Sequence, residues 1–488
     1  MAYLGVIALT YWIMSANVQA WPSFLGIGHT PIDASTLPLT WSPQHNIAWK
    51  AELPGLGQSS PVIWNEIVFV TSISGPMKDT CHVTALALKD GQQLWDRTFP
   101  STQKSRVHYY QSCAAPSPCV DRECVYAFFE TGELVAVRHN GEVVWTRSLV
   151  KDYGPFENDH GLASSLTQTA NAIFVLIDHD GPSYLLAVDK KTGKTLWKTD
   201  RASRRSWASP VVMRIGQRDQ VVVSSQGSVQ GYDVATGKLL WSYEEVGGNV
   251  AGIAYPVANG SFLVYASPGR QDQNLEQARR SNLLMTIEVG PDNTYQPRVQ
   301  WYASALPTFG NVIAHQGIAY WVNRVGVITA YDVNTGKELF SERTKEPCWA
   351  TPLGVGNRVY FFGKDGTTTV IRAGPRFEVL AVNRLWNDES SENKAELPPR
   401  PAEKATHAEP ATKQLTPPPA DAPRPQLVEK TPPPQKASDK PGPRKGPKGE
   451  LFPDPVQYAV AAVNGSLVIR TAKVVYCLRN LNSANPQR

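Results

Sequence analysis

The stretch GYDVATGKLLWSYE, Gly231 to Glu244, has the pattern of two short β-strands joined by a tight turn. Hydrophobic residues alternate with small or polar ones before the turn, and an apolar run ending in Trp241 follows it. The short carboxylate of Asp233 is placed to accept hydrogen bonds from backbone N–H groups two or three residues on, and Gly237 to supply the positive φ of the turn. One such phrase occurs in many β proteins, so its recurrence carries the information.

The phrase recurs as LALKDGQQLWDRT from Leu86, LAVDKKTGKTLWKTD from Leu186 and AYDVNTGKELFSERT from Ala330. Its closing aromatic residue can be followed through eight positions, which lie between 39 and 60 residues apart. This spacing is typical of a four-stranded propeller blade, so the chain is predicted to be an all-β, eight-bladed β-propeller of antiparallel blades. The aromatic residues are expected to dock neighbouring blades; they are Trp49, Trp95, Trp145, Trp197, Trp241, Trp301, Phe340 and Trp386.

A second pattern, of small residues and often proline, opens most repeats. The innermost strand of a propeller blade must be small-sided because neighbouring blades crowd together around the axis. The pattern therefore marks the innermost strands. Its instances are SSPVIW at Ser59, CAAPSP at Cys113, LASSL at Leu162, WASPVV at Trp207 and WATPLG at Trp349.

The two ends of the chain are predicted to share one blade. The segment YAVAAVNGSLVIRTAKVVYCLRN, Tyr458 to Asn480, lacks a closing aromatic strand, whereas NIAWKAELPG, Asn46 to Gly55, carries Trp49 in that role. Pairing the two closes the ring and removes the exposed edges of an open array. We expect seven blades and the N-terminal closing strand within residues 40–388, and the rest of the eighth blade within 456–480.

Composition limits the classes of function. Of the 488 residues 42% are hydrophobic and 14 are Trp, which is ample for a core. The net charge of +5 is small for this length, so nothing indicates a nucleic acid or an anionic membrane as a partner. We expect a protein or an envelope component as the partner instead, and we expect the propeller to be a monomer.

Residues 1–20 form an apolar segment without charged side chains. They end in Val18 and Ala20, the small residues that a signal peptidase prefers before its cut. We predict a cleaved secretory signal, a periplasmic or secreted protein, and no membrane span after cleavage. Because no Lys or Arg precedes the apolar run, an uncleaved anchor or a different start codon is the alternative.

Residues 389–455 hold 17 of the chain's 39 Pro and no aromatic residue before Phe452. Such a segment cannot bury enough apolar surface to offset its ordering entropy, so we predict a disordered insertion in the ring. It is a ligand for a groove-type partner, a spacer, or a solvated insertion that the ring tolerates. The fifth repeat, residues 249–303, is also long, and its polar stretch 268–282 is expected to project from one face.

The A/G-x-D-x-x-T-G-K-x-L-W phrase resembles the repeat of pyrroloquinoline-quinone (PQQ)-type β-propellers, the quinoprotein alcohol dehydrogenase-like superfamily. LTWSPQHNIAWKAELPGLGQSSPV, from Leu39, and WKTDRASRRSWASPVV, from Trp197, are similar to exported bacterial PQQ-like repeat proteins. The resemblance covers nearly everything except the signal segment and the Pro-rich insertion, and it implies the propeller fold. It does not select a function, because the superfamily contains dehydrogenases, an outer-membrane-assembly scaffold lipoprotein and proteins without an assigned role.

Two functions follow from the resemblance. A PQQ- and calcium-dependent dehydrogenase of an alcohol or sugar needs a quinone in the axial funnel, oxygen ligands for Ca²⁺ and a carboxylate base. The adjacent cysteine pair of many alcohol-oxidising members is absent here. A non-catalytic interaction scaffold needs only a rigid disc with variable loops. We predict the scaffold, with no catalytic residue, metal or cofactor, although the lipidated cysteine of the assembly lipoprotein is replaced by Trp21.

Six residues are predicted to line one mouth of the axial channel, because they precede innermost strands. Aromatic rings and cations at this mouth suit an anionic quinone or the surface of a partner. The alternative is structural: both tryptophan rings pack between blades, and the histidine is satisfied within its own loop. The six are His160, Arg204, Arg205, Trp207, Asn249 and Trp349.

Two smaller groups of residues also suggest sites. Cys119 and Cys124 flank the turn VDRE and are predicted to form a disulfide across two strands, with Cys113 as the alternative partner. The other three cysteines are expected to be buried thiols. The side chains of IDHDG, Ile177 to Gly181, form either a cation site or a plain polar hairpin.

Overall fold

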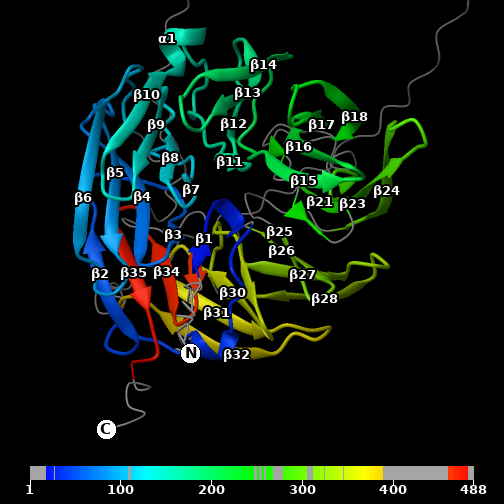
Figure 1. Ribbon diagram of the computed structural model, residues 1–488. Helices are drawn as coiled ribbons and strands as arrows, with labels where there is room; N and C mark the ends of the chain where they lie inside the picture. The colour runs from blue at the N-terminus through cyan, green and yellow to red at the C-terminus, as the bar shows by residue number, and fades with distance from the viewer. Residues whose placement is uncertain are drawn as a thin grey trace, which may run out of the picture. The chain divides into compact units, whose positions relative to one another are not determined.

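The computed structural model consists of antiparallel sheets arranged around one axis (Figure 1). It describes residues 18–26, 28–107, 112–246, 250–251, 255–257, 260–267, 279–304, 312–323, 325–344, 346–387 and 460–481. Three predictions therefore lie wholly or largely outside the described residues: the signal segment, the Pro-rich insertion and the polar stretch of the fifth repeat.

Eight sheets form the eight blades that the repeats predict, and we number them along the chain. The innermost strands are β3 (Val62–Trp64), β7 (Cys119–Val120), β11 (Thr167–Gln168), β15 (Val211–Ile215), β20 (Tyr255–Pro256), β25 (Val312–His315), β29 (Leu353–Val355) and β33 (Ala461–Val463). The second and third strands are β4 (Ile67–Ser74) and β5 (Thr80–Ala87), β8 (Cys124–Phe128) and β9 (Glu133–Arg138), β12 (Ala172–Ile177) and β13 (Ser183–Asp189), β16 (Arg218–Ser225) and β17 (Gly227–Asp233), β21 (Ser261–Val264) and β23 (Leu283–Val289), β26 (Ile318–Val322) and β27 (Val327–Asp332), β30 (Arg358–Phe362) and β31 (Thr367–Arg372), and β34 (Ser466–Arg470) and β35 (Val474–Leu478). The outermost strands are β6 (Gln93–Pro100), β10 (Val143–Ser148), β14 (Thr195–Arg201), β18 (Leu239–Val246), β24 (Tyr295–Tyr302), β28 (Glu338–Arg343), β32 (Val379–Arg384) and, in blade 8, β2 (Ile47–Glu52).

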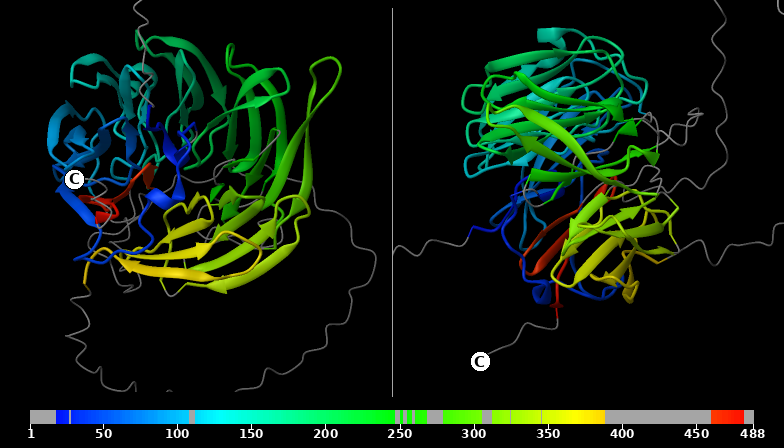
Figure 2. Two further views of the ribbon diagram at one scale, coloured as in Figure 1. Left: turned by 60° about the horizontal axis from the view of Figure 1, so that its bottom comes forward. Right: turned by 90° about the vertical axis from the view of Figure 1, so that its right-hand side faces the viewer.

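The ring closes through the two ends of the described chain. Strand β2 pairs antiparallel with β35, which places Trp49 opposite Cys477. The blue and red strands lie side by side in Figures 1 and 2. The N-terminal strand thus completes the last blade, and the predicted closure is confirmed.

Blades 1 and 5 depart from the four-stranded plan. A short strand β1 (Ala20–Trp21) pairs with the inner edge of β3, and β19 (Val250–Ala251) pairs with β22 (Ala266–Ser267) beside blade 5. The helical elements of the described chain are η1 (Phe24–Gly26), η2 (Ala34–Thr36) and α1 (Leu149–Tyr153). Within those residues no helix has the length and hydrophobicity to span a bilayer.

The repeated turn has the predicted geometry. One carboxylate oxygen of Asp233 accepts hydrogen bonds from the N–H and the hydroxyl of Thr236, both at 2.9 Å, and Gly237 adopts a φ of +71°. Equivalent bonds form in the turns that begin at Asp189 and Asp332. The carboxylate therefore satisfies donors that the tight turn would otherwise leave without acceptors.

Most closing tryptophan rings seat on the turn of the next blade. Trp197 Nε1 donates to the Val234 carbonyl (2.9 Å), and a Cβ on Gly237 would come within 2.5 Å of the Trp197 ring. Trp49, Trp95, Trp145 and Trp301 donate, each at 2.8 Å, to the carbonyls of Leu88, His139, Lys190 and Val333. Trp241 instead donates to Gln220 of its own blade, while Phe340 packs on Phe377 and Trp386 on Gly366.

The innermost strands define two faces of the ring. We call the face on which they turn into the second strands the hairpin face, and the face on which they begin the loop face. Residues 33–36 cross blade 8 on the hairpin face. Asp33 N donates to Asn464 Oδ1, and Gly465 N donates to Thr36 Oγ1, both at 2.9 Å. The chain's own N-terminal segment therefore covers part of the hairpin face.

Candidate functional site

Serine residues at the start of the innermost strands link neighbouring blades. Ser60 N donates to Ser117 Oγ (2.8 Å) and Ser117 N to Ser165 Oγ (3.0 Å). Ser165 N in turn donates to Ser209 Oγ (2.9 Å), so this serine relay runs from blade 1 to blade 4. All four residues are buried. The small-residue pattern predicted crowding around the axis. A Ser recurs at the same place in these repeats, and this recurrence could have predicted the relay.

Four of the six predicted mouth residues lie together on the loop face, between blades 3 and 4. The rings of His160 and Trp207 are 6.0 Å apart, and Trp207 Nε1 donates to the Gly161 carbonyl (2.9 Å). The guanidinium of Arg204 donates to the Ser228 hydroxyl, and Arg205 lies beside it in the chain. Trp207 is thus half-buried against the loop that precedes blade 3, while His160 is exposed.

Arg205 forms the charged edge of this cluster. Its Nε donates to both carboxylate oxygens of Asp180 at 2.8 Å, and its Nη2 lies 3.5 Å from Asp159. The hydrogen bond between the two side chains raises the pKa of Arg205 and lowers that of Asp180. Because 39% of the Arg205 side chain and 43% of the Asp180 side chain are exposed, the pair is open to exchange with charges on a partner.

Beneath this surface lies a fully buried ion pair. Arg201 donates from Nε and Nη2 to the two carboxylate oxygens of Asp178, at 2.9 and 3.1 Å, and from Nη2 to Ser225 Oγ at 2.9 Å. Its Nη1 donates to Gln230 Oε1 at 2.7 Å. The two charged side chains are 1% and 0% exposed, so the hydrogen bonds replace the lost hydration.

His179, between the two aspartates, is also satisfied by protein groups. Its Nδ1 accepts from the N–H groups of Glu157 (2.9 Å) and Gly181 (3.1 Å), and its Nε2 lies 3.1 Å from the Pro182 carbonyl. Two donors at Nδ1 fix the neutral tautomer with hydrogen on Nε2, and burial lowers the pKa of the ring. Asp178, His179 and Asp180 thus each have a protein partner, which favours the polar hairpin over the cation site.

Of the two remaining mouth residues, only Trp349 is described, and it lies on another blade. Trp349 lies before the innermost strand of blade 7, half-buried, with the Lys364 ammonium over its ring at 2.8 Å from the centroid. Asn249 lies outside the described residues, so its place at the mouth stays a prediction. The described cluster comprises His160, Arg204, Arg205 and Trp207.

The disulfide predicted between Cys119 and Cys124 is not formed in the structure. Both residues are buried free thiols, and the strand register places Cys119 opposite Tyr126 rather than Cys124. Burial raises the pKa of Cys119 to about 12 and that of Cys124 to about 11. Cys113, the alternative partner, is a free buried thiol as well.

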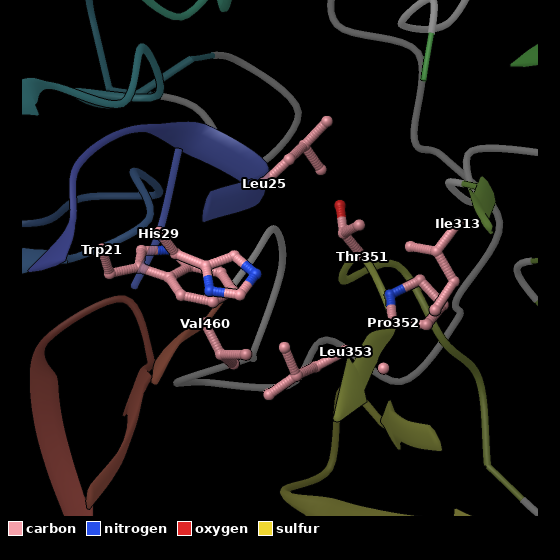
Figure 3. A pocket seen from close by; sticks show the side chains of 9 residues that line it. Trp21, Leu25, His29, Ile313, Thr351, Pro352, Leu353 and Val460 are labelled. Atoms are coloured by element: carbon pink, nitrogen blue, oxygen red, sulfur yellow. The ribbon is translucent and has the colours of Figure 1, made fainter. Parts of the chain in front are cut away.

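The axis is filled on the hairpin face by residues 20–30, of which residue 27 lies outside the described residues; we call this segment the axial loop. Trp21 stacks on His29 with ring centroids 5.2 Å apart. Figure 3 shows these rings with Leu25 across a small pocket from Ile313 and Leu353. Nothing in the sequence pattern indicated this loop, since it lies outside the repeats and overlaps the predicted signal cut after Ala20.

The residues at the axis do not fit a quinone with its calcium ion. Across the described ranges no three His, Cys, Asp or Glu side chains are grouped so that they could hold a metal. On the loop face, the buried carboxylate of Asp178 is engaged by Arg201, and on the hairpin face the axial loop occupies the axis with apolar side chains. The described residues at the axis therefore offer no ligand set for calcium and no open space for the quinone.

These features define an eight-bladed propeller of PQQ-like repeats with a polar and aromatic cluster on its loop face. A family model described as outer membrane protein assembly factor BamB matches residues 41–154, 140–260 and 295–411, and the chain belongs to this family.

Individual relatives agree with this assignment. A BamB from Burkholderia pseudomallei is 29% identical over 213 residues, covering 42% of this chain and 50% of the relative, and one from Salmonella typhimurium is 25% identical over 222 residues, covering 45% and 50%. The matches thus span about half the length of these relatives. The crystal structure of BamB from Moraxella catarrhalis has a TM-score of 0.55 at 11% identity, covering 88% of this chain and 98% of that one, which supports the fold.

Proposed function

We propose that the protein is an exported, non-catalytic scaffold that binds a protein or another component of the cell envelope. It acts as a monomer in the periplasm or outside the cell, without a nucleic acid partner and without PQQ or calcium. The observation that carries this proposal is the family match over most of the ring. The relatives are named as factors of outer membrane protein assembly, a role that requires binding rather than chemistry.

The loop-face cluster is the proposed binding face. Trp and Arg are enriched among the residues that dominate protein interfaces, because they combine apolar area with directed hydrogen bonds. Trp207 supplies a half-buried ring held by the Gly161 carbonyl, and Arg205 supplies an exposed charge whose present partner can be replaced. Both residues lie in the short segment between β14 and β15, whose ends are fixed in the ring, so binding requires little ordering of this face.

Site-specific photo-crosslinking in cells tests the face. A photo-reactive residue in place of His160 should give a reproducible adduct with an envelope component, and R205E should reduce its yield at least tenfold. The matched control is R214E: Arg214, on β15, also pairs with an aspartate (Asp219, 3.1 Å) and is 58% exposed. Equal loss of the adduct in both variants, or no adduct in either background, would argue against the loop face.

Titration with PQQ and Ca²⁺ tests the absence of catalysis. The purified protein should take up no quinone at micromolar concentration, as followed by its absorbance, and should not reduce a dye in the presence of alcohols or sugars. Stoichiometric uptake together with dye-linked oxidation would replace the scaffold with a dehydrogenase.

A further inference from the structure

The axial loop touches almost every blade of the ring. Ala20 pairs with Trp64 at the end of β3 in blade 1, and the Pro22 carbonyl accepts from Val120 N (2.8 Å) in blade 2 and from Gln168 Nε2 (3.4 Å) in blade 3. These contacts lie where the innermost strands end on the hairpin face. One short segment thus joins blades 1 and 2 by backbone hydrogen bonds and blade 3 through the side chain of Gln168.

Apolar side chains of the loop extend toward four more blades. Phe24 is 8% exposed and packs in one cluster with Val211 and Met213 of blade 4. Trp21, 3% exposed, and Leu25 lie against blades 6, 7 and 8, where the pocket is lined by Ile313, Leu353 and Val460. The loop therefore packs against blades 1, 2, 3, 4, 7 and 8 and faces blade 6 across the small pocket, all from the inside of the ring.

The tip of the loop carries backbone strain. At the tip, Leu25 adopts a φ of +65°. Residues other than glycine rarely adopt this backbone conformation, and their surroundings must hold them in it. A Cβ on Gly26 would come within 2.5 Å of the Trp21 ring, so the tip is folded tightly over that side chain.

We infer that the axial loop is a plug: it enters the axis from the hairpin face, and its apolar side chains reach the beginnings of the innermost strands, so that it closes the axial channel. A dangling segment would expose its aromatic side chains, whereas Trp21 and Phe24 are both buried here. Removal of the plug would expose apolar side chains on the innermost strands of several blades at once, so its effect would extend around the ring.

Cysteine labelling can measure the closure. The six native cysteines are buried, with thiol pKa values that burial raises to about 11 or above, so they provide a silent background. Leu353→Cys places a reporter thiol on the channel wall opposite the plug. With the plug intact, a maleimide should label it slowly. Trp21→Ala with Phe24→Ala should accelerate labelling at least tenfold, and a peptide with the sequence of residues 18–30 should slow it again.

Two controls separate a plug from general loosening of the fold. Trp145→Ala removes an outer-rim ring of similar size and should leave the labelling of Leu353→Cys unchanged. Val382→Cys, on β32 and 60% exposed, should be labelled at the same rate whether or not the plug is altered. If the double plug variant does not fold, Trp21→Ala alone should still accelerate labelling at least twofold. Equal rates for the reporter in the parent and the folded plug variants would overturn the inference.

Discussion

Asp178 and Asp180 stand two positions apart in IDHDG, and their environments are opposite. Asp178 is buried with Arg201, whereas Asp180 holds Arg205 at the surface. Asp178→Asn leaves the Arg201 cation buried without its counter-charge, so we expect the free energy of unfolding to fall by about 3–5 kcal/mol. Asp180→Asn should lower it by less than about 1 kcal/mol. Urea unfolding of both variants measures the difference, and equal costs would contradict the buried network.

His179 predicts the direction of the pH dependence of stability. Its pKa lies below the ordinary value near 6.5 because the ring is buried, and the carboxylates of Glu157, Asp178 and Asp180 face it without reversing that shift. The unfolded chain therefore binds the proton first as the pH falls. The contribution of His179 to the free energy of unfolding should be fully present above about pH 6.5. Below that pH the free energy of unfolding should fall, with a slope of up to about 1.4 kcal/mol per pH unit.

His179→Gln is the variant that checks this assignment. It loses hydrogen bonds at every pH, but the difference from the parent should shrink as the pH drops from 7.5 to 5.5. His139 and His315 also have lowered pKa values and titrate in both proteins, so their contribution cancels in the comparison. A constant difference across this range would exclude His179 as a source of the slope.

The recurring turn is the element that couples one blade to the next. Gly237 combines a positive φ with close contact to the Trp197 ring, whereas Gly465 has a φ of +76° and no atom within 4 Å of where its Cβ would lie. Gly465→Ala should cost about 1 kcal/mol in backbone strain alone. Gly237→Ala should cost at least about 1 kcal/mol more, because the Trp197 ring must also move. Thermal unfolding of the two variants tests this ranking.

The elements that sequence could predict are those built from local chemistry. Asp233, Gly237 and Trp241 lie within one turn and its flanking strand, so their pattern is visible in a short window and repeats with the blade. The serine relay and the axial loop depend on residues brought together only by ring closure. Ser165 and Ser209 belong to different blades, and Ala20 pairs with Trp64 outside any repeat. For the predicted mouth residues, the sequence showed that they precede innermost strands, but it did not show that Arg205 pairs with Asp180.

At the scale of the whole molecule, the cysteines report on the integrity of the ring. All six are buried free thiols in the structure. A thiol reagent at pH 8 should modify none of them in the native protein and six after unfolding in guanidinium, because only the exposed thiolate reacts. If four react after unfolding of protein recovered from an oxidising compartment, a disulfide has formed, and Cys119 with Cys124 is the pair to examine by mass spectrometry.

The pairing of β2 with β35 imposes an order on biosynthesis. Cys477 is made only after the first seven blades, so the partner of β2 does not exist until the strands of blade 8 have followed them. Until then β2 is an unpaired strand, and the first blade has no neighbour on one side. Domains usually fold from the N-terminus during synthesis, but this ring must wait for its last blade. A nascent or partly translocated chain is consequently the form most exposed to aggregation and proteolysis, and the form in which a chaperone would act.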